Sequence, residues 1–198
     1  LELYEGIVQE ERDDDTGYEL RSRAALILQE KLDDPTAASD VWETVLGLYP
    51  ADARAACALD SLYQMQEQWS KLADVLSKRV EIAEDDKALR YELLLRLGEL
   101  WESELKNNSE AAACYEKAWR IQANDFFSAR ALVRLLTEEE QPEVLAEILR
   151  SLLDDDDATE AERLRFLLSL GRISAACSGQ GSDAIGYYES VLELERHH

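Results

Sequence analysis

LGELWESELKNNSEAAACYEKA, at residues 97–118, carries the pattern from which the fold of this chain follows. The pattern returns 73 residues later as LGRISAACSGQGSDAIGYYESV, at residues 170–191, with the Leu-Gly pair and the Ala-x-x-x-Tyr spacing in register. The same offset relates Tyr18-Glu19-Leu20 to Tyr91-Glu92-Leu93, and no gap interrupts the register from about residue 18 to residue 195. A fixed period without insertions is typical of a solenoid, because each unit then packs only on its neighbours.

Each 73-residue period contains two helical hairpins of different character. In the first kind, a helix such as the one with Leu97-Gly98 precedes a helix with a small residue, an aromatic residue four positions later and a small or branched residue three positions after that. This spacing places the three residues on one helix face, where small residues opposite a large ring let two backbones approach closely. The three copies are Ala38, Trp42 and Val45; Ala111, Tyr115 and Ala118; and Ala184, Tyr188 and Val191.

The second kind of hairpin keeps the pattern Ala-Leu-x-x-Leu, at Ala58-Leu59 and again at Ala131-Leu132. Capping residues place the helix boundaries: Asp34 stands before Pro35, and Thr159 has Glu162 three positions later. These signals predict eleven helices and no strand. The predicted helices are residues 1–11, 17–32, 35–48, 52–66, 69–83, 86–106, 109–122, 125–139, 142–153, 159–177 and 182–196.

The Leu-Gly pair, the Ala-aromatic-Ala face and Pro50 after the second helix resemble the tetratricopeptide repeat (TPR) family, whose helix-turn-helix unit has about 34 residues. The pattern is degenerate, because Ala123 and Arg196 stand where the other two copies would carry the terminal proline. The resemblance covers nearly all of the chain. It implies an all-α fold, an α-α superhelix or solenoid of TPR-like hairpins with about eleven helices.

The repeat register also predicts the organisation of the chain. Residues 1–16 are interpreted as the second helix of a truncated preceding hairpin, so we expect a fragment of a longer repeat protein. Its apolar face, with Leu3, Tyr4 and Ile7, would then allow weak self-association through an open N-terminal end. Residues 197–198 are two histidines and are interpreted as a tag remnant. The five predicted hairpins are residues 17–50, 51–85, 86–123, 124–157 and 158–196.

Composition narrows the classes of partner. The net charge is -22, with 43 acidic residues against 21 basic ones, which disfavours nucleic acid because a phosphate backbone is bound by clustered Lys and Arg. No apolar run reaches the roughly 18 residues that span a bilayer, so we expect a soluble chain without membrane insertion. The cysteines, Cys57, Cys114 and Cys177, form no C-x-x-C motif. Free thiols suit a reducing compartment such as the cytoplasm, but three cysteines do not fix the localisation.

No residue pattern predicts catalysis, a cofactor or a metal. The histidines are His197 and His198 alone, so the rest of the sequence offers no His-based triad or zinc site. Acidic runs at residues 13–15, 84–86 and 154–157 share one junction of the repeat and lack the glycine and distal glutamate of a calcium loop. We interpret them as solvated caps of the following helices. An all-helical enzyme that uses carboxylates stays open as an alternative.

The TPR resemblance implies a concave groove lined by the first helix of each hairpin. Transferred to this sequence, the groove would be acidic in its first half, apolar around Phe126 and basic at its far end. We expect it to bind an extended or helical protein segment of basic or mixed charge. The predicted binding residues are Glu19, Glu30, Glu92, Leu95, Glu99, Glu102, Phe126, Arg165 and Arg172. Further positions transferred in the same way are Ser22, Leu26, Gln29, Asp60, Tyr63, Ser103, Val133, Leu136, Leu168, Ala175 and Ala176.

Two readings of the whole chain follow. The favoured one is a protein-interaction module or scaffold that uses this groove. The alternative is a structural spacer, in which the array sets a distance between flanking domains, the groove residues are merely solvated and no specific ligand binds. Adjacent rings at Phe126 and Phe127 stand where the other copy has Ala53 and Arg54, and this substitution predicts an exposed apolar contact.

Overall fold

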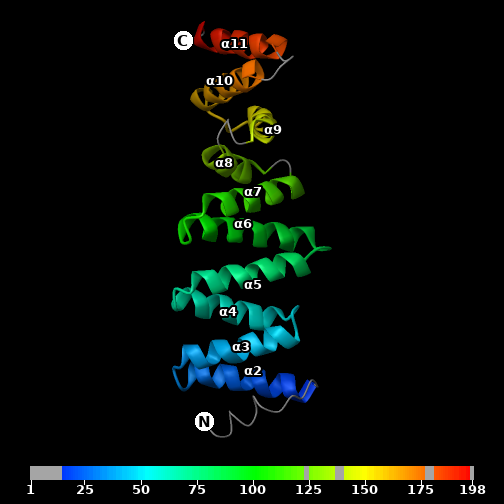
Figure 1. Ribbon diagram of the computed structural model, residues 1–198, viewed down its shortest axis with the longest axis vertical. Helices are drawn as coiled ribbons and strands as arrows, with labels where there is room; N and C mark the ends of the chain where they lie inside the picture. The colour runs from blue at the N-terminus through cyan, green and yellow to red at the C-terminus, as the bar shows by residue number, and fades with distance from the viewer. Residues whose placement is uncertain (1–14, 123–124, 137–140, 177–180, 197–198) are drawn as a thin grey trace. The chain divides into compact units, whose positions relative to one another are not determined.

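A computed structural model describes residues 15–122, 125–136, 141–176 and 181–196, and within them every regular element is an α-helix (Figure 1). The predicted helix at residues 1–11, with its apolar Leu3, Tyr4 and Ile7, lies outside the described residues. The other ten predicted helices are present. They are α2 (Asp15–Glu30), α3 (Pro35–Leu48), α4 (Ala53–Met65), α5 (Trp69–Ile82), α6 (Lys87–Ser103), α7 (Asn108–Ile121), α8 (Phe126–Leu135), α9 (Pro142–Leu153), α10 (Glu160–Ala176) and α11 (Gly181–Arg196).

The chain forms two compact units that divide α6 between them. Unit 1 comprises residues 1–93 and 103–105, and unit 2 comprises residues 94–102 and 106–198. In unit 1, each helix from α2 to α5 packs against the next helix along the chain, and the same holds from α7 to α11 in unit 2. Packing between sequence neighbours is the defining property of a helical solenoid. The predicted all-α class, a solenoid of helical hairpins, is therefore confirmed for the described residues.

Side-chain caps fix the helix starts. Asp34 accepts a hydrogen bond from the Ala37 N–H at 3.0 Å, and Asp52 accepts one from the Ala55 N–H at 2.6 Å. Thr159 and Glu162 form the predicted reciprocal capping box, with Thr159 N–H donating to Glu162 at 2.9 Å. Several helix starts differ from the prediction by one residue, and α2 begins two residues early at Asp15. In α7 the cap is Asn107, so that helix begins at Asn108 and not at residue 109. The predicted helix 125–139 is shorter, since α8 ends at Leu135.

In three hairpins whose turns the structure describes, the turn has a residue with positive φ that is not glycine. Asp33, Glu67 and Lys106 have φ of 51°, 54° and 52°, between α2 and α3, α4 and α5, and α6 and α7. The residue after each one donates its N–H back to a carbonyl near the end of the preceding helix, as in the left-handed termination that usually takes glycine.

The predicted Ala-aromatic-Ala faces form the cores of the units. Ala38, Trp42 and Val45 are buried in unit 1, and Ala111, Tyr115 and Ala118 are buried in unit 2. In the third copy Ala184 and Val191 are buried, but Tyr188 is 37% exposed and therefore only partly a core residue.

The glycines of the Leu-Gly pairs provide room for these rings. A Cβ atom at Gly98 would stand 2.8 Å from Cε1 of Tyr115, and one at Gly171 would stand 2.7 Å from Cε1 of Tyr188. Both distances are shorter than any real contact of a Cβ atom. The two Leu-Gly pairs are therefore helix-packing positions, as the sequence predicts.

The acidic junctions are only partly solvated caps. Asp86 caps α6 by accepting from the Leu89 N–H at 3.1 Å, which agrees with the interpretation. Asp155, in the run 154–157, is only 4% exposed. Its burial contradicts a purely solvated role, and its partners lie at the site described next.

Candidate functional site

Unit 2 contains a pocket of about 700 Å³ between α8, α9, α10 and α11. Its walls carry four arginines and one glutamate, and its floor is apolar. The lining residues are Arg130, Val133, Arg134, Leu149, Glu162, Arg165, Phe166, Leu168, Ser169, Arg172 and Tyr188. All of them belong to unit 2.

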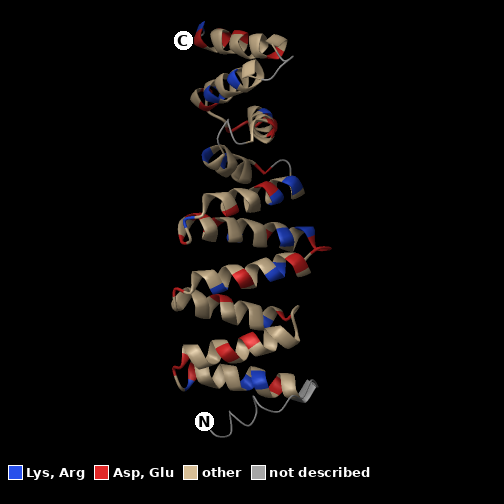
Figure 2. Ribbon diagram, in the orientation of Figure 1, with Lys and Arg blue, Asp and Glu red and all other residues tan. Residues whose placement is uncertain are grey.

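Helix periodicity brings the arginines together. Arg130 and Arg134 lie one turn apart on α8, and Arg165 and Arg172 lie two turns apart on α10. Figure 2 shows the basic residues of α8 and α10 in an otherwise strongly acidic chain. Four of the 21 basic residues of a protein with net charge -22 thus line one pocket. The pocket is a local basic site that overall charge does not predict.

The floor of the pocket is apolar and firmly packed. Leu149 and Phe166 are buried, so they are held by the core of unit 2. Val133 and Leu168 are half-buried and present part of their surface to the pocket. An apolar floor below charged walls is the usual composition of a binding pocket in a protein.

Asp155 holds Arg130 in place. The Arg130 guanidinium donates to a carboxylate oxygen of Asp155 at 2.9 Å and lies 4.0 Å from Glu162. The other oxygen of Asp155 accepts from the Asp157 N–H at 3.0 Å, and Arg163 donates to the Asp155 carbonyl at 2.9 Å. A buried carboxylate with several donors is fixed in position, so Arg130 is preorganised at the pocket.

Arg134 is held by Glu102 of α6. The two oxygens of the Glu102 carboxylate accept from the Arg134 guanidinium at 2.7 and 2.8 Å. The Tyr115 hydroxyl donates to the same carboxylate at 3.2 Å. Burial and the nearby Glu102 charge raise the pKa of Tyr115 well above its usual range, so the phenol stays a donor. Glu102 is therefore engaged within the chain, and its predicted role as an acidic groove residue facing a basic ligand is weakened.

Arg165 and Arg172 are exposed at the mouth of the pocket. Arg172 donates to the Ser169 hydroxyl at 3.1 Å, which orients it along α10. Glu162 stands near Arg130 and Arg165. Hydrogen bonds from the Thr159 N–H and hydroxyl lower the pKa of Glu162, with a smaller contribution from the two arginines, so it is ionised at neutral pH.

The other predicted binding residues separate into exposed and buried ones. Glu19, Glu30 and Glu92 of unit 1 are exposed, as is Glu99 of unit 2. Ser22, Asp60 and Tyr63, which were transferred as groove positions, are buried. They pack inside unit 1, so the transfer is wrong at these three positions.

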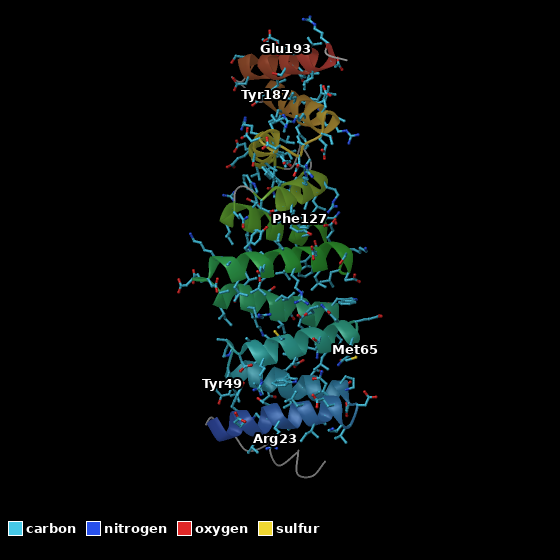
Figure 3. The ribbon with its side chains drawn as sticks, turned by 180° about the vertical axis from the view of Figure 1, so that it is seen from behind. Arg23, Tyr49, Met65, Phe127, Tyr187 and Glu193 are labelled. Carbon is cyan, nitrogen blue, oxygen red and sulfur yellow. The ribbon has the colours of Figure 1, made fainter. Side chains whose placement is uncertain are left out.

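Phe126 is half-buried against the core of unit 2, as is Leu95. The neighbouring residue Phe127 is more exposed than Phe126, with 53% of its surface accessible to solvent (Figure 3). It meets Tyr115 edge to face, with ring centroids 6.4 Å apart. The predicted exposed aromatic contact is thus present one residue later than the predicted anchor.

The structure adds residues that the sequence analysis missed, namely Arg130 and Arg134. Both lie on α8, the first helix of a second-kind hairpin, where the transfer of groove positions selected Phe126, Val133 and Leu136 instead. Two arginines four residues apart in an acidic chain were the available signal, because this spacing places both on one helix face.

A second cavity, of about 550 Å³, lies in unit 1 between α3, α4 and α5. Glu43 occupies its wall and accepts hydrogen bonds from the Tyr63 hydroxyl and, at 2.9 Å, from Lys71. Burial and the Glu43 charge raise the pKa of Tyr63 well above its usual range. Glu43 and Lys71 thus pair with each other, and the remaining charged residues of this cavity, Asp74, Lys78 and Arg79, have mixed sign. The cavity therefore lacks the single excess charge of the basic pocket of unit 2.

Within the described ranges, no group of His, Cys, Asp or Glu residues has the arrangement of a metal site. The helices described here are each too short or too polar to cross a lipid bilayer.

Comparisons with known proteins add little beyond the fold. No family model matches the chain, and no curated protein matches it. Among solved structures, the chain is similar to YrrB, described as a TPR protein with an unusual peptide-binding site. That similarity has 15% sequence identity and a TM-score of 0.46, and it covers 98% of this chain and 93% of the other.

Proposed function

We propose that this chain is a protein-interaction module and that the basic pocket of unit 2 binds an acidic segment of another protein. The observation that carries the proposal is the presence of four arginines around the apolar residues of one open pocket in a chain of net charge -22. The rest of the strongly acidic surface repels an acidic ligand. The basic pocket attracts such a ligand locally and therefore selects it at this one position.

The geometry suggests how a segment would bind. An apolar side chain of the ligand fits on the floor formed by Val133, Leu149 and Phe166. Carboxylates on either side of it pair with Arg165 and Arg172, whose planar guanidinium groups can each hold a carboxylate with two hydrogen bonds. Arg130 and Arg134 already have carboxylate partners at 2.9 and 2.7 Å, so they set the electrostatic potential of the wall.

A basic or mixed-charge ligand segment is proposed for unit 1, where Glu19, Glu30 and Glu92 are exposed. This second part of the proposal rests on those acidic side chains alone, whereas the acidic ligand rests on the pocket of unit 2.

A synthetic peptide with one Leu between Glu residues, labelled with fluorescein, tests the pocket by fluorescence anisotropy. Arg165→Glu with Arg172→Glu should weaken binding by about tenfold or more, since two charge-assisted pairs become repulsive. The matched control is Arg23→Glu with Lys78→Glu, which reverses two exposed charges in unit 1. It makes the same change in net charge and should leave binding within about twofold.

Two outcomes would overturn the proposal. Equal loss in both double variants would show that only net charge matters. Equal binding of a peptide with Lys in place of Glu would show that the pocket does not select acidic ligands. If neither peptide binds, the spacer function, which needs no ligand, replaces the interaction module.

A further inference from the structure

Unit 1 contains a cavity at the place where unit 2 has a buried tryptophan. The cavity of about 550 Å³ lies between α3, α4 and α5, and its volume is within the range of roughly 300–1,000 Å³ that is typical of ligand pockets. Its apolar wall includes Leu46, Leu59 and Val75, and Arg79 lines the same wall. Leu59 and Val75 are buried, and Leu46 and Arg79 are half-buried. The wall is therefore held by the core of unit 1.

The offset of 73 residues pairs each of these four residues with a core residue of unit 2. In chain order, Leu46, Leu59, Val75 and Arg79 correspond to Trp119, Leu132, Ile148 and Leu152. All four counterparts belong to one hydrophobic cluster, and none is more than 5% exposed. Trp119 thus places an indole ring in the core of unit 2, and Leu46 is too small to fill the same position in unit 1.

The rim of the cavity is open at Gly47, which lines it and is exposed. A Cβ atom added to Gly47 would meet no atom within 4 Å. The counterpart in unit 2 is Arg120, whose guanidinium pairs with Glu116 at 2.7 Å. Unit 1 therefore lacks a side chain where unit 2 has a long one, and a ligand can reach Leu46 from solvent on this side.

Polar groups around the wall suit the edge and the face of an aromatic ring. The Tyr63 hydroxyl and the Lys71 ammonium both donate to Oε1 of Glu43, which leaves Oε2 of that carboxylate to accept from an indole N–H. The Arg79 guanidinium lines the same cavity, and a planar guanidinium stacks on the face of an aromatic ring.

We propose that the cavity of unit 1 is a binding site for a flat aromatic ring of the size of indole, in the position that Trp119 occupies in unit 2. The ring packs on Leu46 and Val75 and stacks on Arg79. This site is separate from the pocket of unit 2 and does not depend on its acidic ligand. A tryptophan side chain of a protein segment and a free aromatic molecule share this chemistry, and two arms of the experiment distinguish them.

The probe is N-acetyl-5-fluorotryptophanamide, observed by fluorine NMR during titration with the full chain. We expect a saturable change in its line width. N-acetylcyclohexylalaninamide, which is apolar but not flat, should not displace the probe. The second arm uses a five-residue peptide with the same fluorinated tryptophan between pairs of alanines. Tighter binding of the peptide would assign the ring to a protein segment, and equal or weaker binding would assign it to a free molecule.

Leu46→Trp recreates the arrangement of unit 2 and should fill the cavity with the protein's own ring. We expect it to weaken binding of the probe by about tenfold or more, because the two rings would overlap. It should also raise the urea midpoint, because a packed ring replaces open space. The matched control is Leu48→Trp, at an exposed residue of α3 that does not line the cavity, and it should leave the binding of the probe unchanged.

Arg79→Ala tests the stacking contact without filling the cavity, and it should weaken binding of the probe about threefold. This variant decides the question if Leu46→Trp does not fold, as judged by circular dichroism. Absence of saturable binding would overturn the proposal, as would equal losses in Leu46→Trp and Leu48→Trp or displacement by the cyclohexyl compound. Arg165→Glu with Arg172→Glu should not affect the probe, so the sites of the two units are tested separately.

Discussion

Tyr115 lies on Gly98 so closely that a single methyl group on the glycine would collide with the ring, at 2.8 Å from Cε1. Tyr188 and Gly171 repeat the relationship at 2.7 Å. The two pairs differ in what lies outside the ring, because Tyr115 is buried and Tyr188 is partly exposed. A comparison of the two pairs therefore measures how much the Gly–Tyr contact depends on whether further side chains pack over the ring.

Gly98→Ala should destabilise the chain by about 1–3 kcal/mol, because the buried Tyr115 ring has no free space into which to move. Gly171→Ala should cost less, since the exposed Tyr188 ring can swing outward and alanine favours the helix by about 1 kcal/mol over glycine. Urea denaturation followed by circular dichroism measures both. Equal effects of the two substitutions would mean that the exposure of Tyr188 does not reflect freedom to move.

Ala111→Trp should also destabilise the chain strongly, by about 1–3 kcal/mol or more, which is the usual cost of overpacking. Ala111 is fully buried at the contact between α7 and its neighbours. Ala113→Trp is a suitable comparison, because Ala113 lies two residues along α7 on the other side of the helix and is half-buried. Thermal melting that is unchanged for Ala111→Trp would show that the register of the small residues is misassigned.

Glu43 should contribute to the acid sensitivity of unit 1. Burial raises the pKa of its carboxyl, but the hydrogen bonds from Tyr63 and Lys71 outweigh that effect, and the pKa is lowered overall. A lowered pKa in the folded state gives stability that is present above the ordinary pKa of glutamate, about 4.5, and is lost as the pH falls through the folded value.

Glu43→Gln should therefore lower the stability at neutral pH and flatten its decline between about pH 5 and pH 3. Urea midpoints measured across this range, with Glu81→Gln at an exposed site of α5 as the control, report the effect. A decline of unchanged steepness in Glu43→Gln would assign the acid sensitivity to other carboxylates.

The two described cysteines should differ in reactivity. Burial raises the pKa of the Cys114 thiol to about 11, so little thiolate is present near pH 8, and the side chain is also inaccessible. Cys57 is exposed. Mass spectrometry after brief treatment with iodoacetamide should find Cys57 alkylated well before Cys114, and denaturant should remove the difference. Comparable rates in the folded chain would mean that α7 opens readily.

Salt should act mainly on how fast the acidic peptide associates with the basic pocket. Attraction between exposed charges is screened over about 8 Å at physiological ionic strength, whereas the contact with the apolar floor is not. Stopped-flow measurements between low and high salt should show a falling association rate and a nearly constant dissociation rate. A dissociation rate that changes more than the association rate would place the charged contacts inside the bound complex rather than at its rim.

Most helices could be predicted from the sequence because their signals are local. The spacing of Ala111 and Tyr115, the proline at Pro35 and the capping box at Thr159 depend on neighbours within a few residues. The Leu-Gly pairs could be assigned to close packing for the same reason, since a conserved spacing within one chain indicates a repeated contact.

The basic pocket could be predicted only in part. The sequence predicts Arg165 and Arg172 at the basic end of the groove, but Arg130 and Arg134 of α8 join them only in the folded chain. Arg130 of α8 and Arg165 of α10 line the same pocket because both helices pack against α9. The burial of Asp155 could not be predicted, because a run of aspartates is typical of a solvated segment. Its contacts with Arg130 and Arg163 are known only from the structure. The exposure of Tyr188 depends on whether another helix packs over the ring, and the sequence of α11 alone does not predict this.

The positive φ angles at Asp33, Glu67 and Lys106 have a consequence for engineering. A side chain in the left-handed region costs about 1 kcal/mol or more, and Asp tolerates it better than Glu or Lys. Glu67 and Lys106 lie in different turns and different units, so the gains from replacing them with glycine should add. Because the same strain is present in all three described turns, a longer array built from these units would accumulate it in proportion to its length. A consensus repeat with glycine at this position would then be the more thermostable unit.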